Sequence, residues 1–305
     1  MGSMSGRDWA ILLFLSFLWG GSFFFIEIAV ETVRPFTLVL IRVTIASAAL
    51  WAFLLARGQR LPLPSGAVGA FVILALLNNV LPFVLFAWAQ KTITGGLGSI
   101  LNATTPIWGV IVAHLMTQDE RMTPGKVVGV LLGFGGVALM IGPDLLGEIG
   151  TELWAQLACL VATLCYALAG VYGRRFRGMG IDPVAVSTGQ LTAAVLLVLP
   201  LVLLFEPPWQ ASAPAAEAWA ALVALALFCT SFAYILYFRL IASAGATNAL
   251  LVTFLIPISA ILLGALLLGE VLESRHFAGM AFIGAGLAAI DGRLFRRLRP
   301  AEALR

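Results

Sequence analysis

The most constraining feature of this sequence is a series of long segments that contain no charged side chain. The first runs from Trp9 to Ile26, and six more are at least as long: 61–90, 92–118, 153–173, 183–205, 218–238 and 240–269. A bilayer core about 30 Å thick needs about 20 apolar residues for each spanning helix. Because the apolar residues are continuous and do not alternate with polar ones, they predict spanning helices and not the strands of a membrane barrel.

The composition excludes the main classes of water-soluble protein. Asp, Glu, Lys and Arg make up 11% of the 305 residues, against about 25% in a typical soluble domain. Apolar residues make up 61%, and the mean hydropathy is +1.03. This rules out an ordinary soluble enzyme, a disordered chain and a nucleic-acid-binding protein. The predicted fold class is therefore an all-α integral membrane protein. Its cysteines, Cys159, Cys165 and Cys229, lie in apolar segments and are predicted to be packing residues.

Turn-forming and charged residues divide the chain into ten predicted transmembrane helices. We expect them at 9–28, 36–56, 67–89, 97–116, 125–142, 152–173, 184–204, 217–238, 247–268 and 276–292. The loops between them are short and leave no room for a sizeable soluble domain. Because the number of spans is even, both termini are predicted to lie on the same side of the membrane.

The distribution of Lys and Arg predicts which side this is. If the N-terminus is cytoplasmic, cytoplasmic segments hold fourteen of the eighteen basic residues, and external loops hold only Arg34, Lys91 and Arg275. Cytoplasmic loops of membrane proteins carry such an excess, so both termini are predicted to be cytoplasmic. The basic segment 293–305 is predicted to be a cytoplasmic tail near anionic headgroups, and not a nucleic-acid site.

The two halves of the sequence resemble each other. Each half has a proline, a glutamate and two glycines in the same order. In the first half they are separated by 14, 9 and 7 positions: Pro106, Glu120, Gly129 and Gly136. In the second half they are separated by 13, 9 and 7 positions: Pro257, Glu270, Gly279 and Gly286. We therefore expect two five-helix repeats, 7–143 and 151–292. Because five is odd, the second repeat is inverted, which is typical of carriers with a substrate site at the repeat interface.

These features resemble a known family. The LWGGSFF stretch at 18–24, the 5+5 plan and the doubled Pro–Glu–Gly–Gly pattern are similar to the EamA-domain branch of the drug/metabolite transporter superfamily, and in particular to YddG-type bacterial exporters of aromatic amino acids. The resemblance implies a multi-pass protein of the bacterial inner (plasma) membrane. It also implies export of small metabolites through a central cavity by alternating access.

Three polar residues each precede a proline by four positions: Asn78 before Pro82, Asn102 before Pro106, and Thr253 before Pro257. A proline has no N–H to donate to the carbonyl four residues earlier, so these carbonyls are predicted to be free acceptors. Such groups either line a wet cavity or bind a neighbouring helix across a structural kink.

Aromatic and polar residues near the membrane midplane are further candidates for the cavity. Trp19 lies far from the interfacial zone where Trp is common, and two glycines follow it. The full set of candidate substrate-binding residues is Trp19, Asn78, Asn79, Asn102, Thr163, Tyr166, Tyr234 and Thr253. Core packing is the alternative role for the aromatic members.

Apart from Lys126 at the start of its predicted helix, Arg42 is the only basic residue inside a predicted span. A charge there needs a partner or water. The favoured hypothesis is a structural pair with Glu27 at a similar depth, and the alternative is contact with a substrate carboxylate. Glu120 and Glu270 begin helices and are expected to interact with the helix dipoles. Glu27, Arg42, Pro82, Pro106 and Pro257 are thus predicted to have structural or gating roles.

Sequence motifs separate a carrier from other membrane proteins. The middle thirds of the predicted helices contain no Asp, Glu, Lys, Arg or His, which disfavours an intramembrane enzyme. No catalytic residue, metal site or cofactor is predicted. A proton-coupled exporter of drugs or other metabolites, with the same fold, remains the main alternative to an amino-acid exporter. The first helix lacks the acid that an exporter of cationic drugs would be expected to have. The expected partners are a small-molecule substrate, such as an amino acid, and the lipid bilayer, and the expected assembly is a monomer or a weak dimer.

Overall fold

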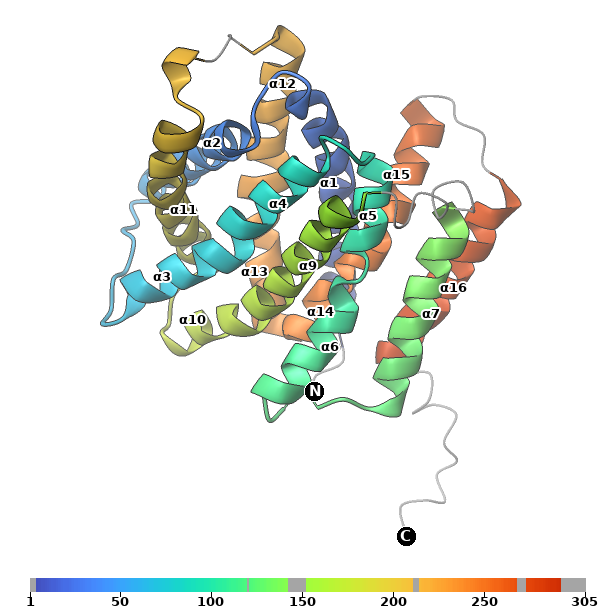
Figure 1. Ribbon diagram of the computed structural model, residues 1–305. Helices are drawn as coiled ribbons and strands as arrows, with labels where there is room; N and C mark the ends of the chain where they lie inside the picture. Colours follow the sequence, from blue (N-terminus) through green and yellow to red (C-terminus); the bar gives the residue numbers. More distant parts are fainter. Residues whose placement is uncertain (1–3, 120, 142–151, 211–213, 268–272, 292–305) are drawn as a thin grey trace, which may run out of the picture.

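A computed structural model describes residues 4–119, 121–141, 152–210, 214–267 and 273–291. Every regular element in these ranges is a helix (Figure 1). The two predicted helix-starting glutamates, Glu120 and Glu270, lie outside the described residues, as do the basic tail 293–305 and the predicted helix ends at 142, 268 and 292.

The first half of the chain contains α1 (Gly6–Val30), α2 (Pro35–Ala56), α3 (Ala67–Ala75), the π-helical turn η1 (Leu76–Val80), α4 (Leu81–Ala89), α5 (Gly95–Asn102), α6 (Thr105–Met116) and α7 (Pro124–Ile141). The second half contains α9 (Leu153–Gly173), α10 (Arg175–Gly178), α11 (Pro183–Phe205), the 3₁₀ turn η2 (Pro208–Gln210), α12 (Ala216–Ala226), the π-helical turn η3 (Leu227–Phe232), α13 (Ala233–Ala244), α14 (Ala246–Leu250), α15 (Val252–Leu267) and α16 (Ser274–Asp291).

Among the described residues, seven helical segments are long and apolar enough to cross a membrane. They are Gly6–Val30, Pro35–Ala56, Ala67–Ala89, Gly95–Met116, Leu153–Gly178, Pro183–Phe205 and Ala216–Ala244. Shorter apolar stretches accompany them in α7 and in α14–α15. The segment predicted to end at residue 238 continues to Ala244, so the exposed Arg239 lies within a helix and not in a loop.

The two π-helical turns have identifiable causes. In η1, the N–H of Leu81 bonds to the carbonyl of Leu76, five residues earlier, and the next residue is Pro82, which has no N–H. In η3, hydroxyl groups replace the missing main-chain donors. Thr230 Oγ1 donates to the Leu225 carbonyl at 2.8 Å, and Ser231 Oγ donates to the Ala226 carbonyl at 2.8 Å. Both turns widen a helix next to the centre of the molecule.

Proline also explains the break between α5 and α6. Pro106 stands in the first turn of α6, where the lack of an N–H is tolerated. The chain therefore leaves helical geometry at Ala103 and Thr104, immediately before it. In the second half, the same kind of break separates α14 from α15 at Leu251, although Pro257 lies inside α15.

Glycines bring α7 and α16 into close contact, and the two helices lie side by side in Figure 1. A Cβ at Gly129 would lie 2.5 Å from the carbonyl oxygen of Gly286, and one at Gly136 would lie 2.7 Å from that of Gly279. As the number rises along α7, its partner's number falls along α16, so the helices run antiparallel. At Gly125 a Cβ would lie 3.3 Å from the carbonyl oxygen of Ala289, so small residues let the two backbones approach closely.

The helices α2 and α11 form a second antiparallel pair. Ser47 Oγ lies 3.2 Å from Thr192 Oγ1 near the middle of the pair. At the other end, Glu206 caps the start of α2 by accepting hydrogen bonds from the main-chain N–H groups of Phe36, at 3.1 Å, and Thr37, at 2.7 Å. These bonds satisfy donors that a helix start leaves unpaired.

The remaining contacts repeat between the halves. α4 packs on α9 and α13 packs on α1, while α6 packs on α9 and α15 packs on α1. Exchanging the two halves therefore exchanges one set of neighbours for the other. The inner faces of these helices surround the centre of the molecule, where the candidate site lies.

Candidate functional site

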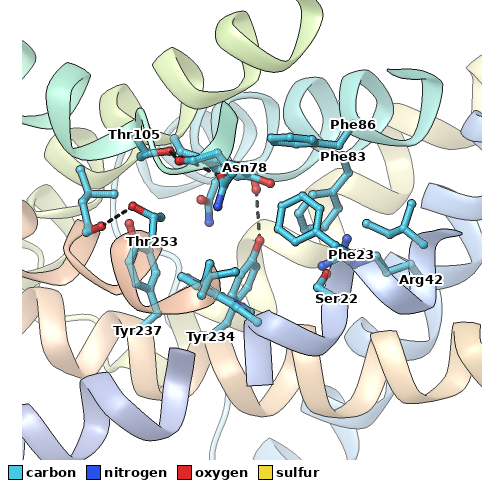
Figure 2. A pocket seen from close by; sticks show the side chains of 16 residues that line it. Ser22, Phe23, Arg42, Asn78, Phe83, Phe86, Thr105, Tyr234, Tyr237 and Thr253 are labelled. Atoms are coloured by element: carbon cyan, nitrogen blue, oxygen red, sulfur yellow. Dashed lines mark hydrogen bonds between the residues drawn. The ribbon is translucent and has the colours of Figure 1, made fainter. Parts of the chain in front are cut away.

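A cavity lies at the centre of the molecule, between helices of both halves (Figure 2). It contains about 660 Å³ of atom-free space, counting the part that opens to its surroundings. Its sixteen lining residues are Trp19, Ser22, Phe23, Ile26, Arg42, Asn78, Phe83, Phe86, Asn102, Thr105, Tyr166, Tyr234, Tyr237, Leu250, Thr253 and Ile256.

One wall of the cavity is aromatic and fixed in place by Trp19. The indole Nε1 donates a hydrogen bond to the Cys229 carbonyl at 3.0 Å. The ring meets Tyr234 edge-on, with centroids 6.5 Å apart, and lies at a tilt to Tyr237, with centroids 5.2 Å apart. Because the N–H is already satisfied, Trp19 presents to the cavity a ring that is held rigidly.

A second aromatic group likewise combines residues from both halves of the chain. Tyr166 of α9 stacks on Phe86 of α4, with centroids 6.2 Å apart and planes 18° apart. Phe86 in turn receives the edge of Phe23, with centroids 5.5 Å apart. The cavity thus lies among aromatic side chains from α1, α4, α9 and α13.

The proline-freed carbonyls differ from the expectation in two of three cases. The carbonyl of Asn78 accepts a hydrogen bond from Tyr234 Oη at 3.1 Å, and that of Asn102 accepts one from Thr105 Oγ1 at 2.6 Å. They are acceptors, as predicted, but neighbouring hydroxyl groups already occupy them. The physical reason is that an unpaired carbonyl inside a membrane is costly, so a nearby donor fills it.

The side chain of Asn78 is also engaged, because its Nδ2 donates to Gln190 Oε1 at 3.1 Å. Asn102 is freer. Its Oδ1 lies 3.5 Å from Thr105 Oγ1, and no other hydrogen bond forms to its amide in the described part of the chain. Within the same limits, the hydroxyls of Tyr166 and Tyr237 have no hydrogen-bond partner. These groups leave both donors and an amide acceptor for a polar ligand.

Arg42 lines the cavity and forms no ion pair with Glu27, which corrects the favoured hypothesis. Glu27 is exposed and lies beside Gly95 at the end of α1. Arg42 is 4% exposed, and its Nε donates to Thr230 Oγ1 at 2.8 Å. Its guanidinium carbon lies 3.6 Å from the centre of the Phe83 ring. The similar depth that the sequence predicts for Glu27 and Arg42 could not reveal that their side chains lie in different surroundings.

Two of the other candidates lie outside the lining. Asn79 is fully buried and donates from Nδ2 to Tyr234 Oη at 2.9 Å. Thr163 is fully buried, and its hydroxyl donates to the Leu160 carbonyl at 2.7 Å. Both side chains therefore support the cavity walls. Trp19, Asn78, Asn102, Tyr166, Tyr234 and Thr253 do line the cavity.

The prolines also lie behind the walls. Pro82 and Pro106 are buried in the first turns of α4 and α6, and Pro257 is buried inside α15.

Sequence reasoning missed several lining residues that helical spacing could have found. Ser22, Phe23 and Ile26 follow Trp19 by three, four and seven residues, and therefore share its helix face. Tyr237 follows Tyr234 by three, and Leu250 and Ile256 flank Thr253 at the same interval. The spacing places each residue on a face, but only the packing of helices from both halves shows that these faces converge.

Comparison with known proteins decides the family. The sequence pattern of the EamA-like transporter family matches residues 8–142 and again 153–290. This chain belongs to the EamA-like transporter family.

Proteins that are similar in sequence to this EamA-like chain are also named as transporters. It is 21% identical over 276 residues to "Uncharacterized transporter YoaV" of Bacillus subtilis, with 90% of this chain and 94% of the relative covered. It is 26% identical over 276 residues to "Uncharacterized inner membrane transporter YedA" of Escherichia coli, with 89% and 86% covered. A solved crystal structure matches with a TM-score of 0.75 at 21% identity, covering 95% of this chain and 99% of the other, which shows the fold alone.

Leu250 lines the cavity of this EamA-like protein and packs against two glycines. A Cβ at Gly109 would lie 2.7 Å from Leu250 Cδ1, and one at Gly170 would lie 3.5 Å from the same atom. The side chain thus fills the space between α6 and α9. Since Gly109 and Gly170 have no side chains, a small shift of α14 changes this contact without moving a bulky group.

A wider hollow lies at the ends of α6, α9 and α13. Asp119 Oδ1 accepts a hydrogen bond from Arg174 Nη1 at 3.0 Å, and the second carboxylate oxygen pairs with Nη2. The Arg174 hydrogen bond and charge hold the pKa of Asp119 below its ordinary value of 3.8. Arg175 and Arg177 line the same hollow. No group of three or more potential metal ligands occurs in the ranges that the structure describes.

Proposed function

We propose that this protein is a carrier that exports small metabolites, most of all amino acids with aromatic or other apolar side chains, in the manner of YddG-type exporters. The observation that carries the proposal is the central cavity, which is bounded by helices of both repeats and combines aromatic walls with a few polar groups. Carrier sites lie at such repeat interfaces.

In this proposal the chain crosses the membrane ten times as two inverted five-helix repeats. The antiparallel course of α7 and α16 supports the inversion, because these helices carry the equivalent glycines of the two halves. The antiparallel pair α2 and α11 supports it in the same way. Two inverted repeats that exchange conformations give inward- and outward-facing states of similar energy, which is the physical basis of alternating access.

Both termini are proposed to be cytoplasmic, in a bacterial inner membrane. The distribution of basic residues supports this orientation, and it places the hollow with Arg174, Arg175 and Arg177 on the cytoplasmic side. In this proposal the hollow is the entrance for substrate. We propose that the protein works as a monomer or a weak dimer.

The chemistry of the cavity supports an amphipathic substrate. Trp19, Tyr166 and Phe86 offer flat surfaces to an apolar side chain, while Asn102 offers both a donor and an acceptor. In the described part of the chain, no Asp or Glu lines the cavity. A proton-coupled exporter of cationic drugs would be expected to have an acid there, so facilitative export of zwitterions is favoured.

The test is counterflow into proteoliposomes that are preloaded with unlabelled amino acid. We expect labelled Phe, Trp and Met to exchange, whether or not a pH gradient is imposed, and Lys and Asp to exchange poorly. Exchange of a cationic dye that requires a pH gradient, without exchange of any amino acid, would replace this proposal with multidrug antiport.

A further inference from the structure

The cavity contains one full charge that no residue in the described part of the chain neutralises. Of the sixteen lining residues in the described part of the chain, Arg42 alone is charged, and no ion pair forms to it there. It lies about two turns into α2 from the Pro35 end, inside a candidate membrane span. Ionisable residues at such depth are costly, and those that occur mark substrate pathways or find a partner.

The contacts of Arg42 leave its two terminal nitrogens available. The Nε is held by Thr230 Oγ1 at 2.8 Å, and the Thr230 hydroxyl uses its own hydrogen for the Leu225 carbonyl. The Phe83 ring covers one face of the guanidinium at 3.6 Å. No described residue accepts a hydrogen bond from Nη1 or Nη2. Because Arg42 is 4% exposed and lines the cavity, these N–H groups are available to the cavity and largely shielded from bulk water.

This arrangement is organised in advance for an anion. A guanidinium held at Nε and stacked on a ring keeps its plane fixed, so its remaining donors keep a fixed direction. A carboxylate matches two such donors in one plane and neutralises the charge. Figure 2 shows Arg42 at one end of the cavity with Ser22 and Phe83, and Tyr237 and Thr253 at the other end.

We propose that Arg42 is the carboxylate-binding group of the cavity and that the substrates are aromatic or apolar carboxylates, whose apolar part lies toward Trp19 and Tyr166. This inference rests on the proposed function and deepens it. It makes the carboxylate the required group of the substrate, while the ammonium of an amino acid is tolerated and not required.

The experiment compares three probes on the full chain in detergent: phenylalanine, 3-phenylpropionate, which lacks the ammonium, and phenethylamine, which lacks the carboxylate. Dissociation constants are measured by calorimetry, and melting temperatures are measured with and without each probe. We expect phenylalanine and 3-phenylpropionate to bind and to raise the melting temperature, and phenethylamine to do neither.

The variant Arg42→Gln then separates binding from structure. We expect a loss of about tenfold to hundredfold in affinity for both carboxylates, since hydrogen bonds to a charged group are lost. Without ligand, the variant should melt no lower than the wild type, because a costly unpaired charge has been removed. Arg34→Gln removes the same charge from the exposed start of α2 and should bind like the wild type. If Arg42→Gln does not fold, Arg42→Lys keeps the charge but loses the planar pair of donors, and should weaken carboxylate binding by about tenfold.

Several results would overturn the assignment. The first is that phenethylamine binds as tightly as phenylalanine, and the second is that Arg42→Gln binds the carboxylates with wild-type affinity. The third is that no probe binds the wild type. The fourth is that chloride alone raises the melting temperature and 3-phenylpropionate raises it no further. The proposed function fails separately. If 3-phenylpropionate binds through Arg42 but no amino acid exchanges in proteoliposomes, amino-acid export is wrong and the carboxylate site stands. If phenylalanine exchanges equally in the wild type and Arg42→Gln, export stands and the site is wrong.

Discussion

Gly129 of α7 and Gly286 of α16 approach so closely that each would clash with a side chain on the other. A Cβ at Gly129 would lie 2.5 Å from the Gly286 carbonyl oxygen, and a Cβ at Gly286 would lie 2.5 Å from the Gly129 carbonyl oxygen. The contact is reciprocal, as the proposed inverted repeat predicts for equivalent helices. It joins the two halves of the chain through main-chain atoms.

Replacing Gly129 by Ala should therefore destabilise the protein. The clash is with backbone and cannot be relieved by a side-chain rotation, so we expect a loss of about 1–3 kcal/mol in the free energy of unfolding. Gly135→Ala is the matched control, because nothing lies within 4 Å of a Cβ at that position. Thermal melting in detergent compares the two. Equal melting temperatures would show that α7 and α16 do not pack in this way.

The cap that Glu206 forms on α2 predicts a second stability effect. Glu206→Ala removes the acceptor for two main-chain N–H groups and for Thr37 Oγ1, and should cost about 0.5–2 kcal/mol. Thr37→Val should cost less, and the double variant should lose less than the sum, because both changes remove the same hydrogen bond. Glu31→Ala, an exposed change of the same charge, is the control. Strict additivity of Glu206→Ala and Thr37→Val would argue against the shared bond.

The Asp119–Arg174 pair predicts how stability depends on pH. The pKa of Asp119 is lowered in the folded protein by the hydrogen bond from Arg174, so the pair stabilises fully above the ordinary Asp value of 3.8 and is lost as pH falls through the lower folded pKa. Because the Asp119 side chain is 63% exposed, we expect an effect of less than about 1 kcal/mol. The melting difference between the wild type and Asp119→Asn should be constant from about pH 5 to 8 and shrink in stronger acid. A difference that grows on acidification would contradict the pairing.

The proposed orientation is tested by cysteine labelling in intact cells. Cys159, Cys165 and Cys229 are buried and can be replaced to give a background without cysteine. Single cysteines within 57–60 or 175–179 should be protected from a reagent that does not cross the membrane, whereas those within 208–214 should react. The opposite pattern would reverse the topology.

The sequence carried most of the fold because the signals for it are local. Charge-free runs marked the helices, and the spacing of Gly129 and Gly136 against Gly279 and Gly286 indicated the repeat. Pro82 and Pro106 indicated helix interruptions, since a missing N–H acts on its own helix. These inferences needed no knowledge of which helices are neighbours.

The site was harder because it depends on long-range contacts. Thr230, which holds Arg42, is separated from it by 188 residues, and Trp19 reaches the Cys229 carbonyl across 210 residues. No spacing in the sequence connects such pairs. The hydroxyl group of Tyr234 likewise occupies the carbonyl of Asn78 across 156 residues, which only the packed structure reveals.

The central claim is that substrate passes through the cavity beside Trp19 and Asn102. The most direct measurement is counterflow of labelled phenylalanine in proteoliposomes that contain Trp19→Ala, Asn102→Leu or the control Leu131→Ala, whose wild-type side chain is 63% exposed on α7. We predict that both cavity variants lose at least about tenfold in transport, since each removes a direct contact of about 1.4 kcal/mol or more, while the control stays within about twofold of the wild type. If both cavity variants transport like the wild type and the control falls, substrate does not pass through this cavity.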